Sequence, residues 1–218
     1  MSIQDRPNYT SGSLVTLPLV LIKSRVMFPH IVVPIYINDK KIFDAIERKS
    51  GVNIFVSAYK HFESASRVDP SSDPNQHFYR TGTVCTVISS RKLPDGRYKA
   101  LVQGLFRAFI VAGVNHNGVV QAKVRKIEDS NIEAQVAKVG VMVDVVRSSL
   151  EKIMSLGKLL SPDLIVVLED IKDPGKFADM IACHLNMKLE EAQNILEIRD
   201  PIQRLSKIHA YLCKEIEN

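Results

Sequence analysis

The spacing of apolar residues changes near residue 130, and this change most constrains what the chain can fold into. Before it, short runs of β-branched and aromatic residues alternate with turn formers, which is typical of strands. After it, apolar residues recur every three or four positions from Ile132 to Ile153, which indicates a helix of about six turns. The sequence therefore predicts an α+β protein with a disordered tail at residues 1–13, a β-rich lobe at residues 14–129 and an α-helical bundle at residues 130–218.

Strand and turn signals follow one another closely in the first half. The apolar stretch at Leu14–Ile22 is interrupted by Pro18, which predicts an edge or bulged strand. Val32–Ile37 is another short apolar run and contains Pro34. Asn38 or Asp39 can cap a short helix that ends near Gly51. Further strands are expected at residues 52–59, 79–89, 98–102, 106–111 and 119–127. Strands of this length and spacing favour a closed or half-closed antiparallel barrel.

Turns and one loop separate these strands. Pro94-Asp95-Gly96 predicts a hairpin, because proline presets the turn and glycine supplies a positive φ angle. Asn117-Gly118 marks a second hairpin in the same way. Residues 61–77 hold turn formers without apolar periodicity, so we expect a mobile loop there.

Helix starts in the second half carry recognisable caps. Ser130 and Glu133 are predicted to form a capping box before the first helix. Three more helices are expected after Ser161-Pro162, Asp173-Pro174 and Asp200-Pro201, since a polar cap accepts from orphan N–H groups and proline needs none. A fifth helix fits residues 189–197. The last helical pattern is long and has no terminating glycine or proline, which predicts a fragment that leads into a further module.

Composition narrows the class of protein and its compartment. Apolar residues make up 45% and charged residues 24%, as in ordinary soluble globular proteins. No apolar run approaches the roughly 18 residues that a membrane-spanning helix needs. The three cysteines are an odd number at wide spacing, and the first residues do not resemble a signal peptide. We therefore expect a cytoplasmic protein without a membrane partner.

Motifs for catalysis, cofactors and metals are missing from the sequence. Gly175-Lys176 lies at a predicted helix start and lacks both the preceding strand and the second glycine of a phosphate-binding loop. Cys183 and His184 are neighbours on a predicted helix and point about 100° apart, which makes a poor nucleophile–base pair. The histidines and cysteines do not fall at metal-ligand spacing. We expect no catalytic residue, no cofactor and no metal in these 218 residues.

Nucleic-acid binding is one alternative that the sequence leaves open. Basic residues outnumber acidic ones before residue 130, and the reverse holds after it. Phe106 and Phe109 with Arg107 come nearest to the interleaving of aromatic and basic residues that stacks single strands. Strand alternation places Phe106 and Arg107 on opposite faces, which favours a barrel wall.

A series of short motifs resembles the N-terminal region of the Lon family of ATP-dependent proteases. The resemblance covers roughly residues 14–217, and its strings occur in the family's order. They are Leu17-Pro18-Leu19, Val26-Met27-Phe28-Pro29-His30, Gly82-Thr83-Val84, Leu93-Pro94-Asp95-Gly96, Val102-Gln103-Gly104, the stretch from Asp173 to Asp179, and the stretch from Leu189 to Gln193. Each string is weak alone, and together they are specific.

The resemblance implies a PUA-like pseudo-barrel lobe and an α-bundle that ends in a long helix toward an ATPase module. It implies a non-catalytic domain for substrate recognition and oligomer assembly, in a serine protease that degrades misfolded and regulatory proteins under stress. ATP with magnesium, the Ser–Lys dyad and a homohexamer would belong to the parent protein. The alternatives are a standalone LON-domain binding module and a PUA-like RNA-binding module.

Met27, Phe28 and Pro29 are the candidate residues for substrate contact. A protease that takes unfolded or misfolded proteins needs exposed apolar surface, and residues around a proline-bounded turn are expected to supply it. Methionine adapts its shape to varied partners. The alternative is that Met27 and Phe28 plug the end of the barrel.

Overall fold

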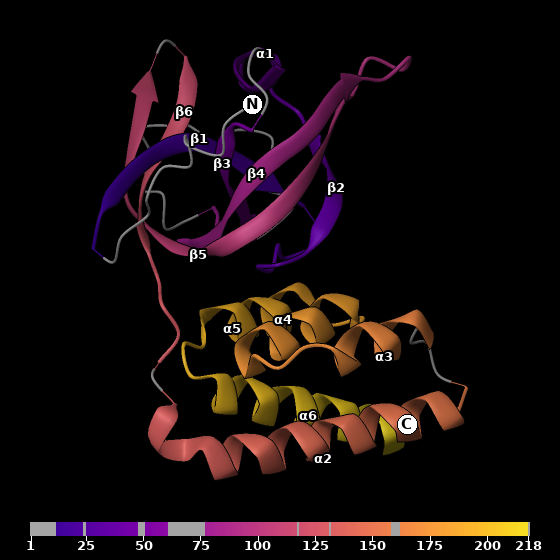
Figure 1. Cartoon of the computed structure of the whole chain (residues 1–218). Coiled ribbons are helices and arrows are strands. Elements are labelled where there is room, and N and C mark those ends of the chain that lie inside the picture. Colours follow the sequence, from indigo (N-terminus) through magenta and orange to yellow (C-terminus); the bar gives the residue numbers. More distant parts are fainter. Residues whose placement is uncertain are drawn as a thin grey trace.

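The computed structural model describes residues 12–23, 25–47, 51–60, 77–116, 118–130, 132–157 and 162–217. Strands gather in one lobe and long helices in the other, and the β lobe is stacked on the helical lobe (Figure 1). The predicted α+β fold, with a long last helix, is confirmed. Most of the predicted tail, residues 1–13, and most of the predicted loop, residues 61–77, lie outside the described residues.

Six strands and one short helix form the β lobe. They are β1 (Leu14–Ile22), β2 (Val32–Ile37), α1 (Lys40–Glu47), β3 (Asn53–Ala58), β4 (Thr81–Lys92), β5 (Tyr98–His116) and β6 (Val119–Lys126). The sheet order is β2-β5-β4-β3-β1-β6, and an additional β5–β6 pairing closes five of the strands into a ring. β2 stays outside the ring. The expected antiparallel barrel is wrong at one place, because β1 and β3 run parallel.

β1 lies inside the sheet order, yet among the described residues each of its halves has a strand partner on one side only, so the expected edge strand is found half by half. Its first half, from Leu14 to Pro18, pairs with β6, and its second half, from Leu19 to Ile22, pairs with β3. Pro18 forms the last pair of the β6 ladder, opposite Gln121. A residue without an N–H group therefore lies where the strand changes partners.

β5 is one strand of 19 residues, where the sequence predicted two. Gly104 does not interrupt it. A Cβ atom on Gly104 would lie 2.3 Å from the backbone oxygen of Phe28, so glycine allows a neighbouring segment to approach. Register shifts within β5 bend it. The bent strand pairs with β2, β4 and β6.

Predicted local signals are confirmed at several turns and caps of the β lobe. Asp39 caps α1, since its Oδ1 accepts from the Lys41 N–H at 2.7 Å. The second predicted hairpin has Gly118 at φ 78°, although Asn117 is outside the described residues. In the first hairpin, the Leu93 N–H donates to the Arg97 carbonyl at 2.7 Å and Gly96 has φ 84°.

Five helices form the helical lobe in two layers. They are α2 (Val136–Ser155), α3 (Pro162–Glu169), α4 (Pro174–His184), α5 (Leu189–Glu197) and α6 (Pro201–Glu217), with a short 3-10 turn at Glu133–Gln135 before α2. α3, α4 and α5 lie next to the β lobe, and α2 and α6 lie beyond them (Figure 1). Asp173 and Asp200 accept from the Lys176 and Ile202 N–H groups at 2.6 and 2.8 Å, which confirms both predicted caps.

The predicted capping box at Ser130 and Glu133 is wrong. α2 begins three residues later than Glu133, and neither it nor the 3-10 turn has a side-chain cap. The Ser130 N–H donates instead to the Arg199 carbonyl at 3.0 Å. The backbone before α2 is thereby committed to the connection between the lobes.

Candidate functional site

The segment from Arg25 to Ile31 joins the two lobes. Val26, Phe28 and Ile31 pack into the apolar core of the helical lobe, while Met27 packs into the core of the β lobe. The His30 N–H donates to the Gly104 carbonyl at 2.9 Å, and the Gly104 N–H donates to the Ile31 carbonyl at 2.9 Å. The Thr83 hydroxyl donates to the Met27 carbonyl. Side chains of one segment therefore alternate between the two cores.

The expectation that the candidate residues are exposed is wrong. Met27 is 3% exposed, Phe28 is 2% exposed, and Pro29 is buried. The helical lobe covers the turn at Met27 and Phe28, whose sequence indicates that it is apolar but not that it is covered. This burial favours the alternative in which the segment plugs the end of the barrel. Contact of these residues with a substrate stays a prediction.

An open groove nevertheless lies beside this segment. The junction groove is a cavity of about 280 Å³ between residues 25–33 of the β lobe and residues 182–192 of the helical lobe. Met27 and Phe28 line it, together with Leu185, Met187 and Leu189 from the helix side. The three helix-side residues are half-buried, so part of their apolar surface meets solvent. This arrangement suits an apolar side chain from outside.

Charge in the junction groove comes from Arg25, which is exposed at its rim. Burial raises the pKa of the nearby Cys183 thiol, and the charge of Arg25 opposes this shift. Cys183 is therefore a lining residue that stays protonated at neutral pH. Desolvation lowers the pKa of His30, and the charge of Asp179 opposes that shift.

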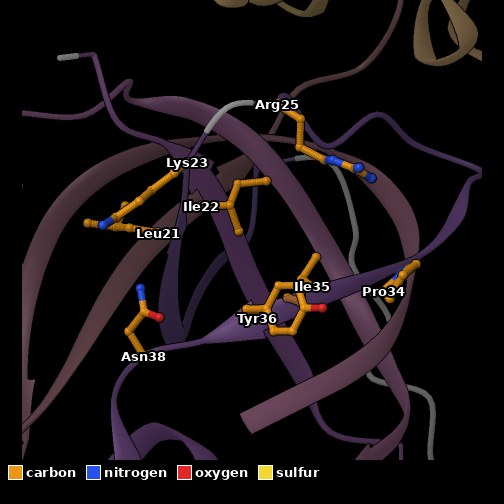
Figure 2. A pocket seen from close by; sticks show the side chains of 8 residues that line it. All are labelled: Leu21, Ile22, Lys23, Arg25, Pro34, Ile35, Tyr36 and Asn38. Carbon is orange, nitrogen blue, oxygen red and sulfur yellow. The ribbon is translucent and has the colours of Figure 1, made fainter. Parts of the chain in front are cut away.

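A second cavity, the strand cavity, lies between β1 and β2 (Figure 2). Its volume is about 290 Å³. Lys23 and Arg25 line it near the end of β1, and Pro34, Tyr36 and Asn38 line it from β2 onward. Because Arg25 lines both cavities, the two form neighbouring parts of one surface.

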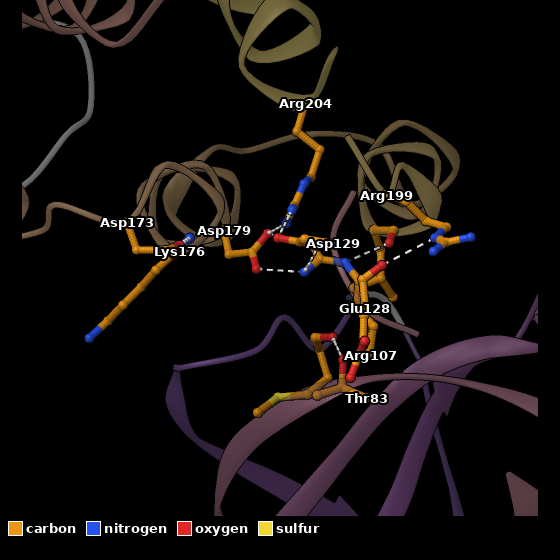
Figure 3. Close-up of polar contacts among 11 residues, drawn as sticks. Thr83, Arg107, Glu128, Asp129, Asp173, Lys176, Asp179, Arg199 and Arg204 are labelled. Atoms are coloured by element: carbon orange, nitrogen blue, oxygen red, sulfur yellow. Dashed lines mark hydrogen bonds and ion pairs between the residues drawn. The ribbon is translucent and has the colours of Figure 1, made fainter. Parts of the chain in front are cut away.

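Buried ion pairs fix the position of one lobe on the other (Figure 3). Asp179 of α4 accepts from Arg107 of β5 through both carboxylate oxygens, and its Oδ2 lies 2.7 Å from Arg107 Nη1. Its Oδ1 also lies 2.7 Å from Arg204 Nη1 of α6. Asp129, in the connection before α2, accepts from Arg204. Arg107, Asp179 and Arg204 are 4%, 1% and 0% exposed, so this ion cluster is screened little by solvent.

Further contacts extend the junction around the ion cluster. Arg107 Nε donates to the Leu196 carbonyl of α5 at 2.8 Å, and Gln193 Nε2 donates to the Thr81 carbonyl of β4 at 3.0 Å. A Cβ atom on Gly175 would lie 2.3 Å from Asp129 Oδ2, so glycine makes room for the carboxylate. α4 and α5 therefore hold the strands of the β lobe directly, and Arg204 of α6 joins Asp179 to the connection before α2.

Sequence reasoning missed the ion cluster. Its members lie in ordinary-looking helix, strand and loop positions, and pairing across 72 residues leaves no local pattern. Asp179 lies two positions from both Phe177 and Ile181, so helical periodicity places it on the opposite face from them. Its burial follows only from the packing of the β lobe against α4.

Other classes of site find little support in the part of the chain that is described. Its His, Cys, Asp and Glu residues form no group of three that could hold a metal ion. None of its helices is both long and apolar enough to cross a membrane. Arg107, which the nucleic-acid alternative needed, is committed to Asp179, and Lys126 lies over the Phe106 ring at 5.5 Å.

Comparison with known sequences gives one family over almost the whole chain. Residues 16–214 match the family described as "ATP-dependent protease La (LON) substrate-binding domain". A Lon protease from Trichlorobacter lovleyi is 36% identical over 206 residues, which are 92% of this chain and 24% of that protein. Lon protease 2 from Bdellovibrio bacteriovorus is 31% identical over 93% of this chain and 25% of its own length. The chain thus spans about a quarter of these relatives.

Solved structures with the same fold share little sequence with the chain. The N-terminal domain of a Mycobacterium avium complex Lon protease matches with a TM-score of 0.70 at 16% identity, over 91% of this chain and 98% of that one. A Lon N-terminal domain protein from Xanthomonas campestris matches with a TM-score of 0.56 at 17% identity, over 90% and 98%.

Proposed function

Because the chain belongs to the family of LON substrate-binding domains, we propose that it recognises protein substrates for an ATP-dependent serine protease. The chain itself is non-catalytic in this proposal. The peptidase dyad, the ATP and magnesium sites and most of the contacts of a homo-oligomer belong to the rest of a cytoplasmic parent protein. Unfolded or misfolded proteins and selected regulatory proteins are its substrates.

The junction groove is the observation that carries this proposal. Unfolded chains differ from folded ones in the apolar side chains that they expose, so their receptor needs apolar surface that water can reach. Leu185, Met187 and Leu189 supply such surface, and methionine fits side chains of different shapes. Met27 and Phe28 then act as the floor of the groove, which is how the predicted segment can contact substrate from a buried position.

A binding measurement tests the groove. Fluorescence anisotropy would follow a labelled, permanently unfolded polypeptide, such as reduced and carboxymethylated lactalbumin, as the protein is titrated into it. Met187→Asp places a charge in the groove on a loop residue, and we expect roughly tenfold weaker binding because an apolar side chain must then meet a desolvated carboxylate.

Val166→Asp is the matched control, since Val166 is 65% exposed on α3 and does not line the junction groove. Equal loss of binding in both variants would mean that surface charge matters and the groove does not. Purified protein should hydrolyse neither ATP nor a peptide substrate, and turnover that persists through further purification would contradict the non-catalytic assignment.

The standalone binding module, which is one alternative, would use the same groove and differ only in the rest of the protein. The RNA-binding alternative predicts a different result. A labelled single-stranded RNA would bind, and its affinity would fall steeply as salt is raised.

A further inference from the structure

β2 has a free outer edge. Among the described residues, β2 pairs with β5 and with no other strand, and it ends the sheet order. An unpaired strand edge carries backbone donors and acceptors that a further strand can use.

Alternation along the ladder identifies these groups. The Gly104 N–H donates to the Ile31 carbonyl, and residues 31 and 104 are in register with the pairs from Val32–Gln103 onward. In an antiparallel pair, successive residues direct their backbone groups alternately toward and away from the partner. Val32, Pro34 and Tyr36 therefore direct theirs away from β5. Pro34 has no N–H, so Val32 and Tyr36 provide the outward donors.

A second strand edge faces the same cavity. The Ile22 carbonyl of β1 accepts from the Tyr59 N–H on the β3 side at 3.1 Å, so the backbone of the preceding Leu21 is directed to the other side. The β1–β6 ladder has already ended at Pro18. Leu21 and Tyr36 both line the strand cavity (Figure 2), so two edges border a space of about 290 Å³.

Charges around the strand cavity are basic. Lys23 and Arg25 line it. Tyr36 is opposite Lys99, and Lys99 is opposite Arg91, so one row of the sheet beside the edge carries two cations. Arg97 also lies over the Tyr36 ring at 4.9 Å, but it pairs with Asp95, so the net charge of this row comes from Lys99 and Arg91. Positive charge around a strand edge favours an acidic partner chain.

We propose that an extended, acidic segment of a polypeptide substrate adds as a strand to the outer edge of β2, with its carboxylates toward Lys23 and Arg25. This inference rests on the proposed function, because it takes the occupant to be part of an unfolded protein. Main-chain hydrogen bonds supply affinity for any sequence, and the cations select segments with Asp or Glu. Pro34 limits the added ladder to a few bonds, which keeps the binding reversible.

One substitution separates strand addition from side-chain contact. Tyr36→Pro removes an outward N–H and leaves the β5 ladder intact, because edge positions with outward N–H groups accept proline. Tyr36→Ala is the matched control, since it loses the same ring and keeps the N–H. Anisotropy with a labelled acidic peptide of ten residues should show binding by Tyr36→Pro that is roughly tenfold weaker than binding by Tyr36→Ala.

Peptide charge tests the second half of the inference. Three peptides of one apolar pattern, with Asp, Asn or Lys at alternate positions, should bind in the order Asp, Asn, Lys. Arg25→Gln should reduce binding of the Asp peptide by roughly threefold to tenfold and change the Asn peptide little. Circular dichroism and a thermal unfolding curve on each variant would show that the fold is kept.

The outcomes distinguish this inference from the proposed function. Equal peptide affinity of Tyr36→Pro and Tyr36→Ala, both folded, would overturn strand addition, and the same affinity for all three peptides would overturn the acidic preference. In both cases the unfolded polypeptide can still bind the wild-type protein at the junction groove. If that polypeptide does not bind wild-type protein at all, the proposed function itself fails.

Discussion

Replacing Asp179 by asparagine should strongly destabilise the protein. The substitution keeps the shape of the side chain and removes the charge that Arg107 and Arg204 share. Both guanidinium groups would remain buried with Asp129 as their remaining carboxylate, and Asp129 is 36% exposed. Removing one partner from a buried ion pair costs about 3–5 kcal/mol. Since the whole free energy of unfolding of a domain is about 5–15 kcal/mol, this is a large share of it.

Urea unfolding would measure the effect. Circular dichroism at 222 nm follows the helical lobe and tyrosine fluorescence follows the whole protein, which has six tyrosines and no tryptophan. A loss of 3–5 kcal/mol should lower the urea midpoint by roughly 1–2 M. Asp170→Asn is the control, because Asp170 is exposed at the end of α3 and should shift the midpoint little.

Two results would refute the reasoning about the ion cluster. One is a midpoint for Asp179→Asn that is as close to wild type as the midpoint of the control. The other concerns the double variant with Arg107→Met, which should recover part of the loss because one unpaired buried charge is gone. A double variant that is less stable by the sum of the two single losses would mean that Arg107 and Asp179 do not interact.

Three further predictions concern backbone packing, pH and thiol reactivity. Gly104→Ala should lower the free energy of unfolding, measured with urea, by about 1–3 kcal/mol, because the new Cβ would meet the Phe28 carbonyl. Gly113→Ala in the same strand should leave it unchanged, since no atom lies within 4 Å of the position of that Cβ. Partial desolvation lowers the pKa of His30 below its ordinary 6.5, so the unfolded chain binds the proton first as the pH falls. The contribution of neutral His30 to stability is therefore present above pH 6.5 and is lost below it. Stability should fall less below pH 6.5 in His30→Asn than in wild type, since asparagine tolerates φ 68°. Equal pH profiles would contradict this. Burial raises the pKa of both Cys85 and Cys183, so iodoacetamide should leave Cys85 unmodified in the folded protein and should label Cys183 slowly. Adding an unfolded polypeptide should slow the labelling of Cys183 further. Labelling of Cys183 at an unchanged rate would argue against occupation of the junction groove.

Local chemistry was enough to predict much of the fold. The caps at Asp173 and Asp200 and the turn at Gly96 involve residues within four positions of each other, so their signals are complete in the sequence. Burial follows the helical period at Val146, Leu150 and Ile153 of α2, whereas β3 is buried on both faces and Val136 is exposed, which the period does not predict. The same local reasoning failed at Ser130, whose N–H is bound to Arg199 across the junction.

Features of the site depend on contacts between distant parts of the chain, and these could not be predicted. The turn at Met27 and Phe28 is apolar in sequence, and only the packing of the helical lobe decides that it is buried. In the sequence, Gly104 indicates the end of a strand. Its actual role, which is to let the backbone of Phe28 approach, depends on a segment that is distant in the sequence. The free edge of β2 was not predicted, and the cavity beside it depends on where β1 changes partners.

The ion pair between Arg107 and Asp179 also sets a time interval during synthesis. Asp179 is made 72 residues after Arg107, which takes roughly 4–14 s at usual rates of translation. All strands of the β lobe are complete before α4 exists. For that interval we expect Arg107 to stay hydrated and the apolar side of the turn at Phe28 to lie open, because the helices that cover both have not been made. The nascent β lobe therefore exposes an apolar surface to which chaperones can bind. This surface is of the same kind as the one that the complete protein is proposed to bind in its substrates.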